Sequence, residues 1–511
     1  MIFHSPDFIV FFVVVTTLYW RLPQRGQNVL LLVASYFFYG YVHPWFLILI
    51  ATSTTIDYLS ARGMERWPER KRAFMALSIV SNFGMLGFFK YFNFFAENVQ
   101  AVLGALGLDV GLPALRIVLP VGISFYTFQA MSYTVDVFRG ELRARRSLLD
   151  VAVFISFFPH LVAGPIQRAS YLLPQVEAPR RFSIERATSG LSLMMWGYFK
   201  KLVIADNVGV IANKVFALGD PSFEILWAGV FAFAIQIYAD FSAYTDIARG
   251  SSRWLGFELT ENFDHPYLAR TPADFWRRWN ISLSTWFRDY VYIPLGGKRA
   301  NGARWVRNVL VTFVLSGLWH GASWNYVLWG LYHGLLLVAT RAHQILGNPL
   351  RRVIGPRPPA IGHRPSDIGY RLSAIGHRTS DIGYRLSVIG YRLSDIARVG
   401  AMFALTLIGW LLFRETDLHA IARDLTLSPW RSTALDRQAG LYLFLLALGY
   451  SIPLWVQSLW VELGRGEQAR SGQAAPGWGI AVVRAVTCGV AFAGILALRS
   501  RTSLDFIYFQ F

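Results

Sequence analysis

Long apolar stretches separated by short polar loops recur along almost the whole chain. Clear examples run over 8–20, 29–42, 45–59 and 74–95. Each approaches the ~20 residues that a helix needs to cross the hydrocarbon core of a bilayer. Further stretches lie at 189–208, 225–247, 309–320, 324–340, 399–413, 440–457 and 480–498. Allowing for tilt and interfacial helices, the pattern predicts an all-α polytopic membrane protein with roughly eleven to thirteen spans. We expect residues 1–511 to form a single membrane domain.

One apolar segment, 151–165, is too short for a full crossing and is interrupted by Pro159, Gly164 and Pro165. Proline and glycine there free backbone groups that lipid cannot satisfy. We therefore expect a re-entrant or broken helix that is buried within the protein.

The stretch 249–307 is too charged to span a membrane and too aromatic for an ordinary linker. Thr271, Pro272 and Asp274 offer a helix start, with a hydroxyl cap, proline in the first turn and an early carboxylate. The helix predicted from there has an apolar face that reaches from Phe275 to Tyr290. Such a helix belongs in the membrane interface or at a cytoplasmic opening.

A heptad repeat rich in Ile, Gly and Arg occupies 354–395. One glycine in each unit and few large aliphatic positions argue against a coiled coil. We expect a basic, mostly disordered insertion in a cytoplasmic loop, with a lipid-surface or partner-binding segment as the alternative.

The composition agrees with the bilayer as the solvent. The chain is 54% hydrophobic and only 16% charged, a balance that water-soluble domains rarely show. The net charge of +18 does not indicate nucleic-acid binding, because the basic residues lie in short loops rather than along one aromatic-lined stripe. Basic residues next to spans attract anionic lipid headgroups, so we expect anionic lipids as partners.

Basic residues also fall in alternate loops, around 21–25, 62–72 and 139–146, whereas the loops near 43 and 97–116 hold almost none. Because cytoplasmic loops carry the excess of Lys and Arg, this pattern places the N-terminus outside and the basic loops in the cytoplasm.

Two of the ten histidines, His320 and His333, lie within apolar helices. Ionisable groups at membrane depth are costly, which makes each a candidate for function. His320 is the stronger candidate, because small neighbours such as Ser316 and Gly317 would let an acyl chain or a second backbone approach. A neutral imidazole can accept a hydroxyl proton and later return it. A buried, hydrogen-bonded histidine is the alternative for both.

Polar residues near the predicted interfacial helix could handle a thioester substrate. Asn280, at helical spacing from Trp276, could stabilise charge on a carbonyl oxygen, or could bond another helix. Arg277, Arg278 and Lys298 could hold coenzyme phosphates, or could be ordinary cytoplasmic-side charges.

Two carboxylates, Asp240 and Asp246, sit at the inner end of an apolar helix. Six helical residues separate them by about 240° of rotation, so they cannot share a metal ion on one face. Helix ends and buried polar networks are the roles we expect, and no metal is expected. The chain has no Walker loop, HExxH, GxSxG or dinucleotide fingerprint.

Several motifs occur in a fixed order: Pro120–Phe125, Phe157–Ile166, Asp240–Gly250, Asp274–Ile293, Leu318–Gly321 and the terminal Phe506–Phe511. Together they resemble the membrane-bound O-acyltransferase superfamily, most of all its bacterial alginate O-acetyltransferase branch. Asn280 matches an asparagine of the wider superfamily, where the alginate branch often has histidine.

The resemblance implies a ring of transmembrane helices around a central tunnel, with re-entrant and interfacial helices. Its essential histidine matches His320, and we assign Asn280 to the thioester carbonyl. We assign to the substrate or the tunnel wall Ser316, Trp319, Trp276, Arg277, Tyr244, Asp240 and His333.

The implied donor is cytoplasmic acetyl-CoA, and the implied acceptor is an extracytoplasmic polysaccharide such as alginate, reached directly or through a periplasmic partner acetyltransferase. The implied location is the bacterial inner membrane, crossed several times.

Three alternatives remain open from sequence. His320 could act as a general base or could carry an acetyl group covalently. D-alanyl transfer from a carrier protein to teichoic acid is a close rival. A polysaccharide transporter would share the broken helices and intramembrane charges, but would favour internal repeats between the halves of the chain, and none is seen.

Overall fold

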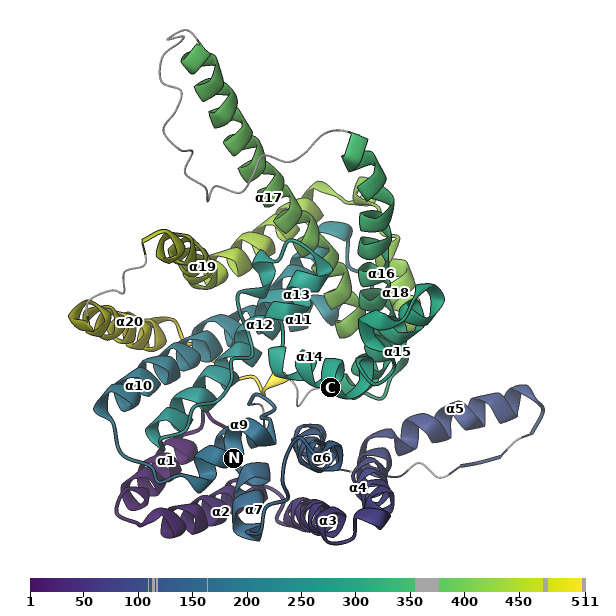
Figure 1. The fold of residues 1–511 in the computed structure, drawn as a ribbon. Helices are drawn as coiled ribbons and strands as arrows, with labels where there is room; N and C mark the ends of the chain where they lie inside the picture. The colour runs from purple at the N-terminus through teal and green to yellow at the C-terminus, as the bar shows by residue number, and fades with distance from the viewer. Residues whose placement is uncertain are drawn as a thin grey trace.

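The computed structural model describes the chain apart from residues 109, 113, 114, 116, 117, 163, 354–375, 472–476 and 508–511. Side chains are also not described over 346–353, 376–393, 463–471 and 477–484. Within the described part every regular element is a helix, as Figure 1 shows. The all-α prediction is confirmed.

The first half of the chain forms shorter helices. Their bounds are α1 (Pro6–Tyr19), α2 (Gln24–Gly40), α3 (Phe46–Arg66), α4 (Lys71–Leu86), α5 (Phe92–Ala105), α6 (Ile123–Arg139), α7 (Leu148–Ser156), α8 (Phe158–Leu161), α9 (Ala169–Glu177), α10 (Ile184–Phe199) and α11 (Asp206–Phe216).

The second half holds the longest helices. Their bounds are α12 (Phe223–Trp254), α13 (Pro272–Arg278), α14 (Ile281–Phe287), α15 (Gly302–His320), α16 (Trp324–Val353), α17 (Gly376–Arg414), α18 (Leu418–Leu425), α19 (Ala434–Ser471) and α20 (Gly477–Leu498).

Short turns join some of these helices. Wide π-helical turns cover η2 (Gly87–Tyr91), η3 (Lys200–Ala205) and η5 (Arg288–Tyr292), and tight 3-10 turns cover η1 (Pro68–Arg70), η4 (Pro266–Leu268), η6 (Gly297–Arg299) and η7 (Pro429–Arg431).

Four helical segments in the described residues are long and apolar enough to cross a membrane: Pro68–Ala105, Phe223–Trp254, Ser394–Arg414 and Ala434–Glu462. Two shorter apolar helices, Pro6–Tyr19 and Ala485–Leu498, add to them. This is fewer than the eleven to thirteen spans expected, because many apolar stretches fold as helices of 17 residues or fewer, such as α2 with 17 and α10 with 16. A multi-pass membrane protein is nevertheless the architecture that these helices indicate.

Helix α12 is the central helix of the fold. It packs against α10, α11, α17 and α19, and 89% of its most apolar stretch is buried within the protein. A helix that is apolar all round and buried belongs to a core rather than to a lipid-facing surface.

The interrupted segment after α6 is broken and buried, as expected. α7 and α8 meet at Phe157, and the residues around this break, Phe154, Phe158 and Leu161, are fully buried. The neighbouring protein therefore encloses the free backbone groups of this break.

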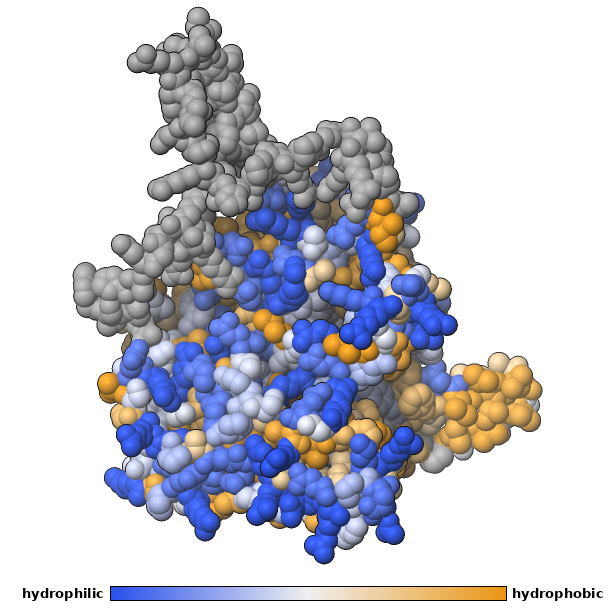
Figure 2. Space-filling model, in the orientation of Figure 1, coloured by the Kyte–Doolittle hydropathy of each residue, from blue (hydrophilic) through white to orange (hydrophobic). Residues whose placement is uncertain are grey.

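Helix α5 extends away from the other helices together with the end of α4 (Figure 1). Its exposed surface is apolar, through Phe95, Val99 and Val102, and Figure 2 shows it in orange beside a mostly hydrophilic face. Exposed apolar side chains of this kind are suited to contact with lipid.

The first units of the heptad repeat, 354–375, lie outside the described residues. The remaining units, from Gly376 onward, form the first part of helix α17. The sequence had led us to expect a mostly disordered linker over the repeat. Figure 1 shows that this end of α17 projects beyond the neighbouring helices.

A buried ion cluster joins α11, α12 and the C-terminal segment. The Lys201 ammonium contacts the carboxylates of Asp206 at 3.0 Å and Asp240 at 3.1 Å, and it donates to the carbonyl of Leu504 at 2.8 Å. Asp240 also accepts from the backbone N–H of Ile507 at 2.7 Å. Removing one partner of a buried ion pair leaves an uncompensated charge in a low-dielectric interior.

We therefore expect Lys201→Met to destabilise the fold by about 3–5 kcal/mol. Thermal unfolding in detergent should show a clear drop of the midpoint. Lys214→Met is the control, because Lys214 is exposed on α11, and it should unfold like the wild type. Equal midpoints for all three proteins would show that the cluster does not stabilise the fold.

Candidate active site

Helix α15 carries His320 at its C-terminal end, against the helix that follows it. α15 packs closely on α16, and glycines make this approach possible. A side chain at Gly317 would collide with the carbonyl of Tyr326, and one at Gly330 with the carbonyl of Phe313. The small residues beside His320 therefore admit a second backbone, which is one of the two roles expected of them.

Four residues on one face of α15 line cavities: Val309, Thr312, Ser316 and His320. Their spacing of three or four places them on one side of the helix. The first three border a large cavity and His320 borders a small one. His320 thus lies one helical turn from Ser316, which lines the large cavity.

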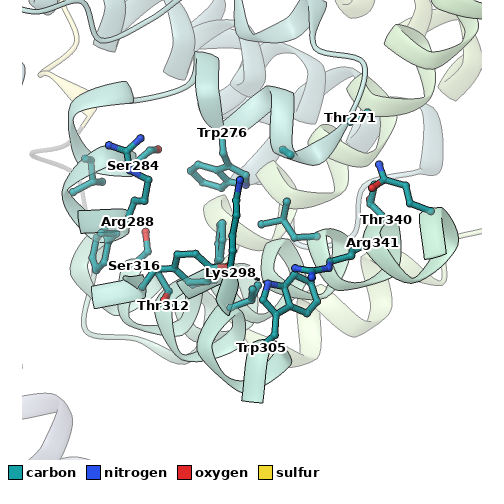
Figure 3. A pocket seen from close by; sticks show the side chains of 18 residues that line it. Thr271, Trp276, Ser284, Arg288, Lys298, Trp305, Thr312, Ser316, Thr340 and Arg341 are labelled. Atoms are coloured by element: carbon teal, nitrogen blue, oxygen red, sulfur yellow. Dashed lines mark hydrogen bonds between the residues drawn. The ribbon is translucent and has the colours of Figure 1, made fainter. Parts of the chain in front are cut away.

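The large cavity has a volume of about 480 Å³ and is lined mostly by apolar side chains of α13, α14, α15 and α16 (Figure 3). Ser316 is buried in its wall, whereas Arg288 and Lys298 are exposed. Arg341 also lines it and lies over the ring of Trp305 at 4.2 Å. An apolar space bordered by cations suits a molecule with an anionic part and an uncharged part.

The small cavity has a volume of about 120 Å³ and is lined by the Pro120–Phe125 motif, Lys90, Val162, Trp319 and His320. Gly122 of this motif has a left-handed φ of 78°, and a side chain there would lie 2.8 Å from the carbonyl of Leu161. Glycine is thus required where α6 begins against the buried segment.

His320 is buried and surrounded by aromatic rings. The centroids of Trp319 and Trp329 lie 5.0 Å from its own, and that of Phe413 lies at 5.2 Å, all nearly perpendicular to the imidazole. This packing fixes the ring next to the small cavity. Trp319 lines the same cavity, and its assignment to the substrate wall stays a prediction.

Asn280 does not lie on a continuous helix. Thr271 caps α13 as expected, accepting from the N–H of Asp274 at 3.2 Å, but the helix ends at Arg278 and α14 begins at Ile281. Asn280 stands between them with a left-handed φ of 41°. Asparagine tolerates this conformation better than most residues, which explains the break that helical spacing did not predict.

The Asn280 side chain is buried, and neither atom of its amide has a hydrogen-bond partner in the described part of the chain. A buried unpaired amide is costly. It lines neither cavity.

Of the other predicted wall residues, Ser316 and Trp276 line the large cavity. His333 lines neither cavity. It packs between Phe275, Trp276 and Trp329, with ring centroids 4.9–6.1 Å away. This environment is that of a packed core histidine.

The remaining three candidates also lie away from the two cavities. Arg277 is exposed and pairs with Asp274 at 3.3 Å. Asp240 belongs to the Lys201 cluster, and Tyr244 contacts His4 at 3.1 Å between its hydroxyl and the imidazole Nδ1. These three residues line neither of the two cavities, and their assignment to the substrate or the tunnel wall stays a prediction.

Sequence reasoning missed Arg288, Arg341 and Trp305 as cavity residues. Lys298 was considered for coenzyme phosphates together with Arg277 and Arg278, but Arg278 instead pairs with Glu462 at 3.3 Å. The sequence pattern did not indicate the turn at η5, which changes the direction of the chain after α14. Within the described residues no three His, Cys, Asp or Glu side chains come together as a metal site.

Comparison with known proteins bears directly on this arrangement. The family model for membrane-bound O-acyltransferases matches residues 41–344, which include α15 and both cavities. The chain belongs to the membrane-bound O-acyltransferase family. It is therefore an O-acyltransferase, and the resemblance noted from its motifs is confirmed.

The names of similar proteins refer to alginate or to peptidoglycan. A probable alginate O-acetylase of Pseudomonas putida is 33% identical over 100% of both chains. One from Azotobacter vinelandii is 40% identical over 68% of this chain and 70% of its own. A peptidoglycan O-acetyltransferase of Helicobacter pylori is 34% identical over 67% of this chain and 71% of its own.

In this acyltransferase, two substitutions distinguish how much the backbone conformation at Asn280 and its side-chain amide each contribute to stability. We expect Asn280→Ala to destabilise the protein by about 1 kcal/mol, because alanine is strained at positive φ. Asn280→Gly should unfold within a few tenths of a kcal/mol of wild type, since glycine adopts this conformation freely.

Thermal unfolding of the two variants under identical detergent conditions checks this prediction. Equal destabilisation by alanine and glycine would mean that the amide, and not the backbone conformation, stabilises the break.

Proposed function

We propose that this membrane-bound O-acyltransferase moves an acetyl group from cytoplasmic acetyl-CoA to a hydroxyl of an extracytoplasmic polysaccharide such as alginate, directly or through a periplasmic partner, in a bacterial inner membrane. The observation that carries the proposal is the position of His320, which borders the small cavity one helical turn from Ser316 in the wall of the large one. The names of the relatives support an acetyl group and a polysaccharide acceptor.

The large cavity suits the donor. Lys298, Arg288 and Arg341 offer cations for the phosphates of a coenzyme, and the Trp305 indole offers a surface for a planar base. The apolar walls between them and Ser316 would hold the uncharged arm that ends in the thioester. The acetyl group then arrives next to His320.

The small cavity suits the acceptor hydroxyl. It borders His320 and the Pro120–Phe125 motif, and the charge pattern of the loops predicts that the chain before this motif lies outside the cytoplasm. The two substrates would thus reach the imidazole from opposite sides.

The chemistry needs one proton acceptor. The hydroxyl oxygen attacks the carbonyl carbon of the thioester while the His320 imidazole takes the hydroxyl proton. The carbon–sulfur bond breaks, the thiolate leaves, and the imidazolium returns the proton to it, which yields an ester and a free thiol. Asn280, whose buried amide has no partner in the described residues, is our candidate for holding the carbonyl oxygen.

We expect His320→Gln to lower acetyl transfer by about 10²–10⁴-fold, the usual contribution of a positioned general base. His333→Gln is the matched control, since His333 is also a buried histidine but lines neither cavity. It should keep activity within about tenfold at equal folded abundance. The measurement is turnover of radiolabelled acetyl-CoA by the protein in lipid nanodiscs, with an alginate oligosaccharide as acceptor.

Two results would count against this assignment. Full activity of His320→Gln would remove the imidazole from the reaction. Absence of acetyl-CoA turnover by the wild type, with turnover of a D-alanyl carrier protein instead, would move D-alanyl transfer ahead. A trapped acetyl group on His320 would favour the covalent route over direct transfer.

The donor site gives a separate prediction. We expect Lys298→Ala and Arg341→Ala each to raise KM for acetyl-CoA by about tenfold, the value of one charged hydrogen bond to phosphate. Arg277→Ala should leave KM unchanged, because Arg277 is exposed outside the cavity.

The same variants should act on S-acetyl-pantetheine like the wild type, because this thioester lacks the nucleotide. An equal loss with both thioesters would show that the cations do not bind the nucleotide part.

A further inference from the structure

Lys90 is a half-buried lysine that the proposed chemistry does not use. It lies in the π-helical turn η2, between α4 and α5, and it lines the small cavity together with His320. No carboxylate forms an ion pair with it within the described part of the chain. A cation held in a membrane protein without a counter-ion is costly and points to a role.

Its contacts define that role. The Lys90 ammonium donates to the carbonyl of Trp319 and, at 3.1 Å, to the carbonyl of His320. Its third contact is the Ser124 hydroxyl at 3.3 Å. The next residue of the same turn, Tyr91, donates its hydroxyl to the carbonyl of Leu318 at 2.6 Å.

These three carbonyls belong to the last turn of α15. The last four carbonyls of an α-helix have no partner within the helix, and α15 ends at His320. A cation at this end also compensates the negative pole of the helix dipole. In a regular α-helix, two consecutive residues point about 100° apart. Lys90 and Tyr91 both contact this end of α15 from the wide turn. Such turns occur frequently at functional sites.

We propose that Lys90 is a positioning residue for the reaction, which caps α15 at His320 and so fixes the imidazole beside the small cavity. This inference rests on the proposed function for its kinetic consequences, but the placement of the imidazole can be measured without any substrate.

The kinetic test compares Lys90→Met, Lys90→Arg and Tyr91→Phe in nanodiscs. We expect Lys90→Met to lower kcat for acetyl transfer by about 10–100-fold, with KM for acetyl-CoA changed less than about threefold. Lys90→Arg should recover part of kcat, because arginine keeps the cation. Tyr91→Phe should lower kcat by less than Lys90→Met, because it removes a neutral contact. Lys214→Met, an exposed lysine of α11, should match the wild type.

The second measurement is the rate at which diethyl pyrocarbonate modifies His320 in the same proteins, followed by mass spectrometry without acetyl-CoA. We expect Lys90→Met to change this rate by about threefold or more, and Lys214→Met to leave it unchanged.

The outcomes separate the two proposals. If the wild type shows no acetyl transfer but Lys90→Met alters His320 modification, the proposed function fails and the positioning role stands. If the wild type transfers acetyl and Lys90→Met changes neither kcat nor modification, the role of Lys90 is overturned. If Lys90→Met does not fold, Lys90→Gln takes its place, because it also removes the cation, and unchanged kcat and modification in this variant overturn the role of Lys90.

Discussion

The close packing of α15 on α16 is the constraint on which the site depends. Glycines at 317 and 330 bring each helix against a backbone carbonyl of the other, and side chains of both helices line the large cavity beside this contact. In a bilayer there is no hydrophobic drive between helices, so close van der Waals contact through small residues must hold them. The position of the imidazole follows from that contact.

Two buried regions of the fold are held in different ways. Around α12, opposite charges meet directly, as Lys201 does with Asp206 and Asp240. Around His320, aromatic rings pack against the imidazole, and the Lys90 ammonium donates to the backbone carbonyl of His320. The first arrangement ties distant segments together, whereas the second holds one ring in a defined place.

Sequence reasoning reached the helical class and the buried broken segment, because apolar length and proline position are local signals. The cap at Thr271 was local too. Asn280 was placed wrongly on a helix face, since a single left-handed residue leaves no mark in the spacing of apolar positions.

The cations of the large cavity and the partners of Asp240 could not be predicted in the same way. Arg341 and Trp305 meet across α15 and α16, and Asp240 meets Ile507 across 267 positions of the chain. Such pairings depend on tertiary packing and not on local pattern. Lys90 was noticed only as a charge near the end of a span, because the π-helical turn that aims it at α15 is not encoded by a recognisable motif.

The unequal sizes of the two cavities have a consequence for which acyl groups the protein can handle. The large cavity, of about 480 Å³, would accommodate acyl groups longer than acetyl. The small cavity beside His320 has a volume of only about 120 Å³. Each added methylene would gain about 0.8 kcal/mol on entering the apolar space, so longer thioesters would bind well. Acyl groups would then be discriminated by length at the small cavity, and long-chain thioesters would act as competitive inhibitors rather than as substrates.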